Sequence, residues 1–197
     1  MRLKTMGALA LVAATLAGAL PAMAESSTTP FFFNLFPRPS NFGNGPVKGY
    51  SSVHRQVVPY KSAYKPGTVV VNTAERRLYL VQDNGTAVKY GIGVGRDGFR
   101  WGGVKTITRK AEWPGWTPPP QMLQRRPDLP RYMPGGIDNP LGARAMYLGS
   151  TLYRIHGSNE PETIGQAVSS GCFRMTNDDV KDLYDRVHVG TTVVVLN

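Results

Sequence analysis

Cysteine is almost absent from this sequence: Cys172 is the one cysteine among 197 residues, and histidine occurs only three times. A single thiol cannot form a disulfide within the chain, so an internal disulfide framework is excluded. One cysteine and three scattered histidines also argue against a zinc site, which takes four such ligands at set spacings. We therefore expect no metal and no cofactor, and the lone thiol is an accident, an intermolecular link or a nucleophile.

Long apolar runs are also scarce, and the one candidate covers residues 6–20. It follows Arg2 and Lys4 and ends at Ala22-Met23-Ala24, a signal-peptidase pattern. The run is about fifteen residues long, short of the roughly twenty that a spanning helix needs, and no cysteine follows it to carry a lipid anchor. We predict a signal peptide over 1–24, export to the periplasm or cell envelope, and no membrane-spanning segment after cleavage.

Acidic residues are few, with 13 Asp and Glu against 23 Lys and Arg and a formal charge of +10. This balance favours an acidic partner, such as nucleic acid, anionic lipid or a carboxylate-bearing polymer, although a basic surface can simply be soluble. Export argues against nucleic acid. Charge alone does not choose among the remaining partners.

Residues 25–65 are rich in Ser, Pro, Gly and Asn and show no lasting period, which predicts an extended arm or linker. The apolar stretch 31–36 within it could dock on the domain or on a partner, or be a sticky patch on a disordered arm. We place a single folded domain at 66–197.

The folded part reads mostly as short strands. β-Branched and aromatic runs flank Asn84-Gly85, the strongest short signal for a hairpin. A helix is predicted from Thr176 or Asn177 to about Arg186. Strands are predicted at 68–71, 77–82, 87–90, 106–110, 143–148, 152–156 and 191–196, with a short helix within 161–167. The pattern predicts a mostly β sandwich or barrel with short helices.

Residues 111–140 interrupt this pattern with many prolines, two tryptophans and no period. A structureless segment of this length inside a compact domain is usually functional or partly disordered. Basic residues outnumber acidic ones around it, which would attract a carboxylate-rich substrate. We expect a stiff wall of a groove, with Trp116 among the substrate-binding residues.

The lone cysteine stands in the segment SSGCFRM, and His156 of the segment HGSN lies sixteen residues before it. A thiolate attacks carbonyl carbon, and we expect a neighbouring imidazolium or helix N-terminus to lower the thiol pKa from about 8.5. Gly171 would let the backbone approach a ligand closely, and two successive amides there could face an oxyanion. Taken singly, each residue could equally be structural, as a small buried cysteine or a hydrogen-bonded core histidine.

The sequence resembles the L,D-transpeptidase catalytic domain family (YkuD-like) over about residues 66–196. The resemblance is carried by HGSNEP, IGxAVSSGCFRM, NDDVxDLY and VxVGTTVVV, together with WPxWxPP and NPLGARAMYL. It implies a cell-wall enzyme that cleaves a peptidoglycan tetrapeptide stem before its terminal D-Ala. The acyl group then passes to an amine, which gives a 3-3 cross-link or attaches an envelope protein to peptidoglycan.

The resemblance also implies roles for individual residues. Cys172 would be the nucleophile, His156 its base, and Gly157 the residue whose carbonyl orients the imidazole. Arg174 would bind the donor carboxylate or support the loop, with a plain surface salt bridge as the alternative. Ser170 stands where part of the family has a second histidine. The remaining pocket residues that it implies are Ser169 and Gly171.

Two other classes of protein stay open. A sortase or papain-like peptidase would also use cysteine and histidine, but papain-like enzymes place the cysteine before the histidine, and sortases place their arginine farther from the cysteine. A non-catalytic envelope-binding protein would keep the basic loop and not need the thiol.

Overall fold

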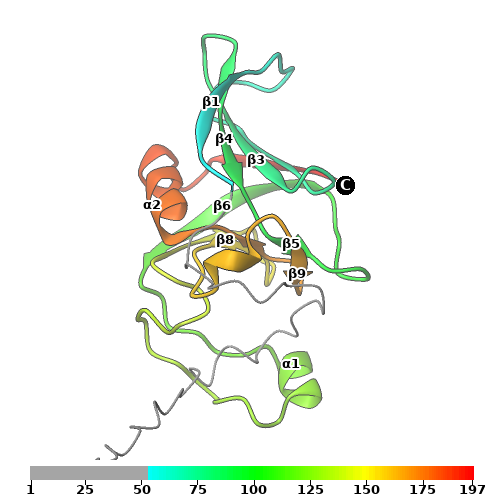
Figure 1. The fold of residues 1–197 in the computed structure, drawn as a ribbon, viewed down its shortest axis with the longest axis vertical. Helices are drawn as coiled ribbons and strands as arrows, with labels where there is room; N and C mark the ends of the chain where they lie inside the picture. The colour runs from blue at the N-terminus through cyan, green and yellow to red at the C-terminus, as the bar shows by residue number, and fades with distance from the viewer. Residues whose placement is uncertain (1–52) are drawn as a thin grey trace, which may run out of the picture.

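The computed structural model describes residues 53–197, so the predicted signal peptide and the apolar stretch 31–36 lie outside the described part. Short strands dominate it, as predicted (Figure 1). The elements are β1 (Gln56–Pro59), β2 (Val69–Asn72), β3 (Arg77–Val81), β4 (Thr86–Gly91), β5 (Val94–Gly95), β6 (Gly103–Glu112), α1 (Pro120–Arg125), β7 (Arg144–Leu148), β8 (Arg154–His156), the 3-10 turn η2 (Pro161–Thr163), β9 (Ala167–Ser169), β10 (Phe173–Arg174), α2 (Asn177–Arg186) and β11 (Thr192–Leu196).

Nine strands follow one another in the order β1-β4-β3-β2-β11-β6-β7-β8-β10, and β5 pairs with β9 in a separate two-stranded sheet. The prediction of a mostly β domain is confirmed. The barrel that we considered is wrong, because β1 and β10 lie at opposite ends of the strand order and do not pair with each other.

Strand β6 belongs to both halves of the sheet. Its first residues, 103–106, pair with β11, and residues 107–112 pair with β7. The register shifts between Ile107 and Arg109, an irregularity of the kind that bends a strand and increases its twist. The bend lets the strands on either side of β6 contribute to one core. In it, Leu78 of β3 and Tyr90 of β4 join Ile155 of β8 and Phe173 of β10.

The middle of the sheet is a parallel pair. Val69–Val71 of β2 runs beside Val193–Val195 of β11, and all six valines are buried. A parallel pair covered on both faces favours a continuous valine run over an alternating one. Helix α2 packs on this core through Val180 and Leu183, and Thr176 caps its N-terminus by accepting a bond from the Asp179 amide at 3.1 Å.

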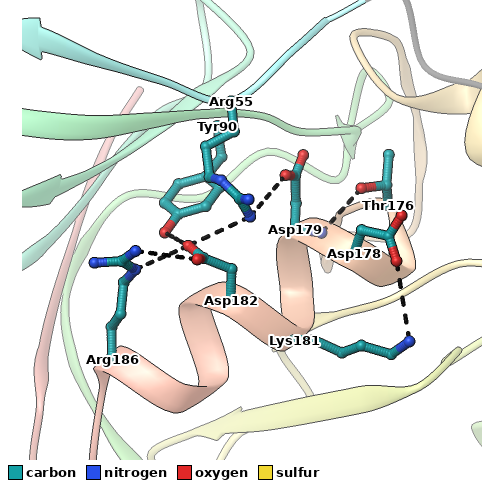
Figure 2. Close-up of polar contacts among 8 residues, drawn as sticks. All are labelled: Arg55, Tyr90, Thr176, Asp178, Asp179, Lys181, Asp182 and Arg186. Atoms are coloured by element: carbon teal, nitrogen blue, oxygen red, sulfur yellow. Dashed lines mark hydrogen bonds and ion pairs between the residues drawn. The ribbon is translucent and has the colours of Figure 1, made fainter.

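The last part of the predicted arm is joined to the domain. Strand β1 pairs with β4, and Arg55 just before it reaches Asp179 and Asp182 of α2 at 3.5 and 3.4 Å (Figure 2). The Tyr90 hydroxyl donates to Asp182 at 2.6 Å. Burial, and then this hydrogen bond, raise the pKa of Tyr90 above its usual range. The domain start at residue 66 stays a prediction, but residues 56–59 already extend the sheet.

Two local predictions need correction. The helix expected within 161–167 is only the turn η2 followed by β9, because Gly165 adopts a φ of +89° that no helix contains. Residues 111–140 are not structureless, since β6 continues to Glu112 and α1 follows. Figure 1 shows α1 well away from the main sheet.

The segment around α1 has a small core of its own, made by Trp116, Leu129, Met133 and Leu141. Trp116 and Met133 exchange two backbone hydrogen bonds of 2.8 Å. The buried Asn139 amide donates to the Pro134 carbonyl at 2.8 Å, and its oxygen accepts from Leu141 at 2.9 Å. Below, residues 113–142 are called the loop lobe.

Within residues 53–197, no helix has the length and apolar character needed to cross a bilayer.

Candidate active site

Two short strands bring the predicted site residues together. Strands β8 and β10 run parallel, with Ile155 opposite Phe173 and His156 opposite Arg174. Because side chains alternate along a strand, Ile155 and Phe173 enter the core while His156 and Arg174 project from the other face. By the same register, Cys172 lies opposite Arg154 and on the face of His156.

That face borders a cavity of about 470 Å³. The structure places six of the eight predicted site residues on its wall: Trp116, His156, Ser169, Ser170, Cys172 and Arg174. Gly157 and Gly171 do not line it. Their backbone groups instead contact the side chains of site residues: the Gly157 carbonyl contacts His156, and the Gly171 amide donates to Ser169.

His156 is only 5% exposed and its Nδ1 lies 2.6 Å from the Gly157 carbonyl oxygen. A carbonyl only accepts, so this contact assigns the proton to Nδ1 and leaves Nε2 with a free lone pair. Burial first, and then the positive charges of Arg174 and Arg154, lower the pKa of His156 to about 3. The imidazole is therefore neutral at neutral pH, as a general base must be.

Cys172 is half-buried, with its sulfur 3.6 Å from the Leu152 carbonyl oxygen. Burial raises the pKa of the Cys172 thiol, and the positive charge of the nearby Arg154 opposes this rise. The expected thiolate beside an imidazolium is thus wrong for the resting site, because His156 is uncharged. Thiol and imidazole are both neutral until a proton moves between them.

A tight turn holds the cysteine. The Ser169 hydroxyl donates to the Cys172 carbonyl at 2.6 Å and accepts from the Gly171 amide at 3.1 Å. Gly171 has a φ of +103°, and a Cβ there would lie 2.6 Å from the Tyr153 ring. Glycine is therefore required for packing against Tyr153, and its amide is engaged by Ser169, so the expected pair of amides facing an oxyanion does not include Gly171.

Arg174 is 2% exposed and its guanidinium lies 2.9 Å from the Glu160 carboxylate, which is itself buried. Thr163 is a second partner at 3.3 Å. The alternative of a surface salt bridge is therefore wrong. The contacts tie β10 to the segment that carries η2, which fits the loop-supporting role better than a free carboxylate-binding one.

Two residues near the site escaped sequence reasoning. Asn177, at the start of α2, accepts a bond from the Ala143 amide at 2.9 Å and fills the space that a Cβ would need at Gly142 or Gly157. It thereby holds the backbone whose carbonyl orients His156. The sequence offered one indication of this close packing, namely the glycines at positions 142 and 157. The second residue is Arg154, which lines the cavity beside the sulfur.

The opposite wall comes from the loop lobe, through Trp116, Met122 and Arg125. The Arg125 guanidinium lies 5.6 Å from the centre of the Phe99 ring, which borders the same cavity. The predicted groove wall is thus where the sequence placed it. In the described residues, no cluster of three or more His, Cys, Asp or Glu side chains could hold a metal ion.

Comparison with known proteins supports one family. The model of the L,D-transpeptidase catalytic domain family (YkuD) matches residues 66–195. The probable L,D-transpeptidase ErfK/SrfK of Escherichia coli is 44% identical over 138 residues, covering 66% of this chain and 44% of that protein. The probable L,D-transpeptidase YbiS of the same organism is 40% identical over 134 residues. The chain spans less than half the length of these curated relatives.

Solved structures share the fold. A Brucella melitensis protein described as a probable carnitine operon oxidoreductase is 50% identical, with a TM-score of 0.50, over 73% of this chain and 93% of that one. Its name denotes another activity, so it contributes only sequence and fold. L,D-transpeptidase 3 of Mycobacterium tuberculosis has a TM-score of 0.52 at 16% identity, covering 66% and 60%, and supports the fold alone. Because the family model covers more than half of its length, this chain belongs to the L,D-transpeptidase catalytic domain family.

Proposed function

We propose that this protein is an exported peptidoglycan L,D-transpeptidase of the periplasm or cell envelope, with Cys172 as nucleophile and His156 as general base. One observation carries the proposal. The lone thiol of the chain and a neutral imidazole, fixed through Nδ1 to the Gly157 carbonyl, border one cavity.

The first step acylates the enzyme. Nε2 of His156 takes the thiol proton as the Cys172 sulfur bonds to the carbonyl carbon of the third residue in a tetrapeptide stem. The amide bond to the terminal D-Ala then breaks, and the protonated imidazole gives its proton to the leaving amine. A neutral starting pair suits this order, because the imidazole is free to accept the proton at the moment of attack.

The second step transfers the acyl group. The neutral imidazole removes a proton from an acceptor amine while the nitrogen of that amine attacks the thioester carbonyl. The carbon–sulfur bond breaks, and the proton returns to the Cys172 sulfur. An amine of a second stem would give a 3-3 cross-link, and an amine of an envelope protein would attach that protein to peptidoglycan.

The remaining predicted residues fit supporting roles. Ser169 and Gly171 shape the cysteine turn, and Arg174 braces β10 against Glu160. Ser170 and Trp116 face the cavity that receives the donor. The excess of basic residues over 96–131, with eight Lys and Arg against three Asp and Glu, favours a carboxylate-bearing polymer such as peptidoglycan over a neutral substrate.

The test is product analysis with a soluble tetrapeptide stem. We expect the full chain to release the terminal D-Ala and to form a dimer linked through the third residues, and Cys172→Ala to do neither. A sortase-like or other peptidase would instead cleave at another bond. A protein that binds sacculi equally well with and without the thiol and yields no product would be a non-catalytic envelope protein.

A further inference from the structure

Three arginines line the cavity, and they differ in what balances their charge. Arg174 is paired with the buried Glu160 carboxylate at 2.9 Å. Arg125 stands on α1 in the opposite wall, near the Phe99 ring. Arg154 stands at the start of β8, and among residues 53–197 no carboxylate lies within ion-pair distance of it. Arg154 is thus the cavity cation nearest the thiol whose charge no carboxylate balances.

Arg154 is also fixed beside the reacting atom. Continuing the β8–β10 register by one residue places it opposite Cys172, and its Cζ atom lies 5.2 Å from the Tyr147 ring centre. Its Nε is buried and has no hydrogen-bond partner among the described residues. An unmatched buried donor is costly, so an acceptor that arrives with a ligand would relieve that cost.

We propose that Arg154 receives the free α-carboxylate of the terminal D-residue in the donor stem, and so restricts the enzyme to stems that end one residue beyond the scissile bond. This inference rests on the proposed function. In such a donor, only the amide nitrogen and one Cα separate the scissile carbonyl from the terminal carboxylate. When the Cys172 sulfur attacks this carbonyl, the carboxylate therefore comes to lie near the Arg154 guanidinium, which lines the same cavity. A guanidinium can bind a carboxylate through two parallel hydrogen bonds.

Recognition of this kind also assists the base. The charge of Arg154 is one of the causes that hold the pKa of His156 low. A bound carboxylate would offset that charge and raise the basicity of Nε2 when the donor is in place. A longer stem carries an uncharged amide at this position, so it would lose both the ion pair and the gain in basicity.

The experiment compares two donors that differ in one group, a tetrapeptide with a free C-terminal carboxylate and the same peptide with a C-terminal carboxamide. For each, kcat/KM for release of the terminal residue is measured with the parent, Arg154→Gln and Arg154→Lys. The ratio of the two donors cancels any effect of a substitution on the thiol itself. Arg109→Gln is the matched control, because Arg109 also stacks on Tyr147, at 3.6 Å, but lies exposed outside the cavity.

We expect the parent to prefer the carboxylate donor by about 10- to 100-fold, the range for loss of a charged hydrogen bond. Arg154→Gln should lose most of this preference, Arg154→Lys should keep part of it, and Arg109→Gln should keep it all. Equal use of both donors by the parent, or an unchanged preference in Arg154→Gln, would overturn the inference. If Arg154→Gln does not fold, the parent ratio and Arg154→Lys decide. Release from neither donor by the parent would instead refute the proposed function.

Discussion

The two walls of the cavity are built in different ways. The strand wall, β8, β10 and the cysteine turn, is held by the sheet ladder and by the main core through Ile155 and Phe173. The loop lobe is held by a separate core of four side chains and by the hydrogen bonds of Asn139. The first wall presents the thiol and the imidazole, and the second presents Trp116 and Arg125. Because its core is the smaller of the two, we expect the loop lobe to open at lower cost than the strand wall that carries the proposed chemistry.

The largest expected effect tests the strand wall. His156→Ala should lower the rate of acylation of Cys172 by about 10²- to 10⁴-fold, the usual contribution of a general base. The thiol pKa, measured by alkylation with iodoacetamide across pH, should stay above its ordinary value, because a neutral imidazole supplies no charge to lose. His54→Ala and His188→Ala, both exposed, should match the parent. Slow acylation in either control with a normal rate in His156→Ala would mean that another base serves the thiol.

The next effect tests whether the loop lobe is an independent unit. Trp116→Ala should destabilise the lobe by about 3 kcal/mol, as large core truncations do. Amide hydrogen exchange should quicken within residues 113–142 and stay unchanged in β8 and β10. Trp113→Ala is the control, since Trp113 is 43% exposed and lies outside that core. Faster exchange in both walls would show that they unfold together.

A smaller effect follows from the buried imidazole. The folded protein holds His156 neutral, with its pKa lowered to about 3, whereas the unfolded chain binds a proton below about pH 6.5. The stability contribution is therefore complete above pH 6.5 and is lost as pH falls. From pH 7 to pH 5 the loss should be about 2 kcal/mol. Urea unfolding should show a steeper decline for the parent than for His156→Gln over that interval, and parallel declines would contradict the assignment of a buried neutral histidine.

The smallest effect separates two neighbouring arginines of the loop lobe. Arg125 is exposed and lines the cavity, whereas Arg126 is half-buried and paired with Asp128 at 2.7 Å. Arg125→Glu should weaken binding to isolated sacculi by several-fold, most at low salt, because exposed charges are screened at higher ionic strength. Arg126→Glu should have less effect. Equal losses for both variants would assign the attraction to overall charge and not to the cavity.

The predictability of these two walls differs for a physical reason. Strands and the cysteine turn leave local signals, such as the valine run of β11, the Asn84-Gly85 turn and the glycine before Cys172. Pairing of the strands then places these locally predictable segments side by side. The fold of residues 113–142 depends on contacts between distant positions, such as Trp116 with Met133, and proline-rich sequence has no period that reveals them.

The same limit explains what was missed or misjudged at the site. No motif in the sequence marks Arg154. Its position near Cys172 follows only from the pairing of β8 with β10. The direction in which the thiol pKa shifts depends on burial, and the spacing of residues along the sequence does not reveal burial. The partner of Arg174 was likewise hidden, because Glu160 reaches it only through the fold.

The most direct measurement is the intact mass of the full chain during reaction with a tetrapeptide donor and no acceptor. The account predicts one covalent adduct with the mass of the donor acyl group after loss of the terminal D-Ala, formed by the parent and absent from Cys172→Ala. Because Cys172 is the one thiol of the chain, no second cysteine could carry the adduct. An adduct that persists in Cys172→Ala, or products that form in that variant at the parent rate, would contradict a cysteine nucleophile.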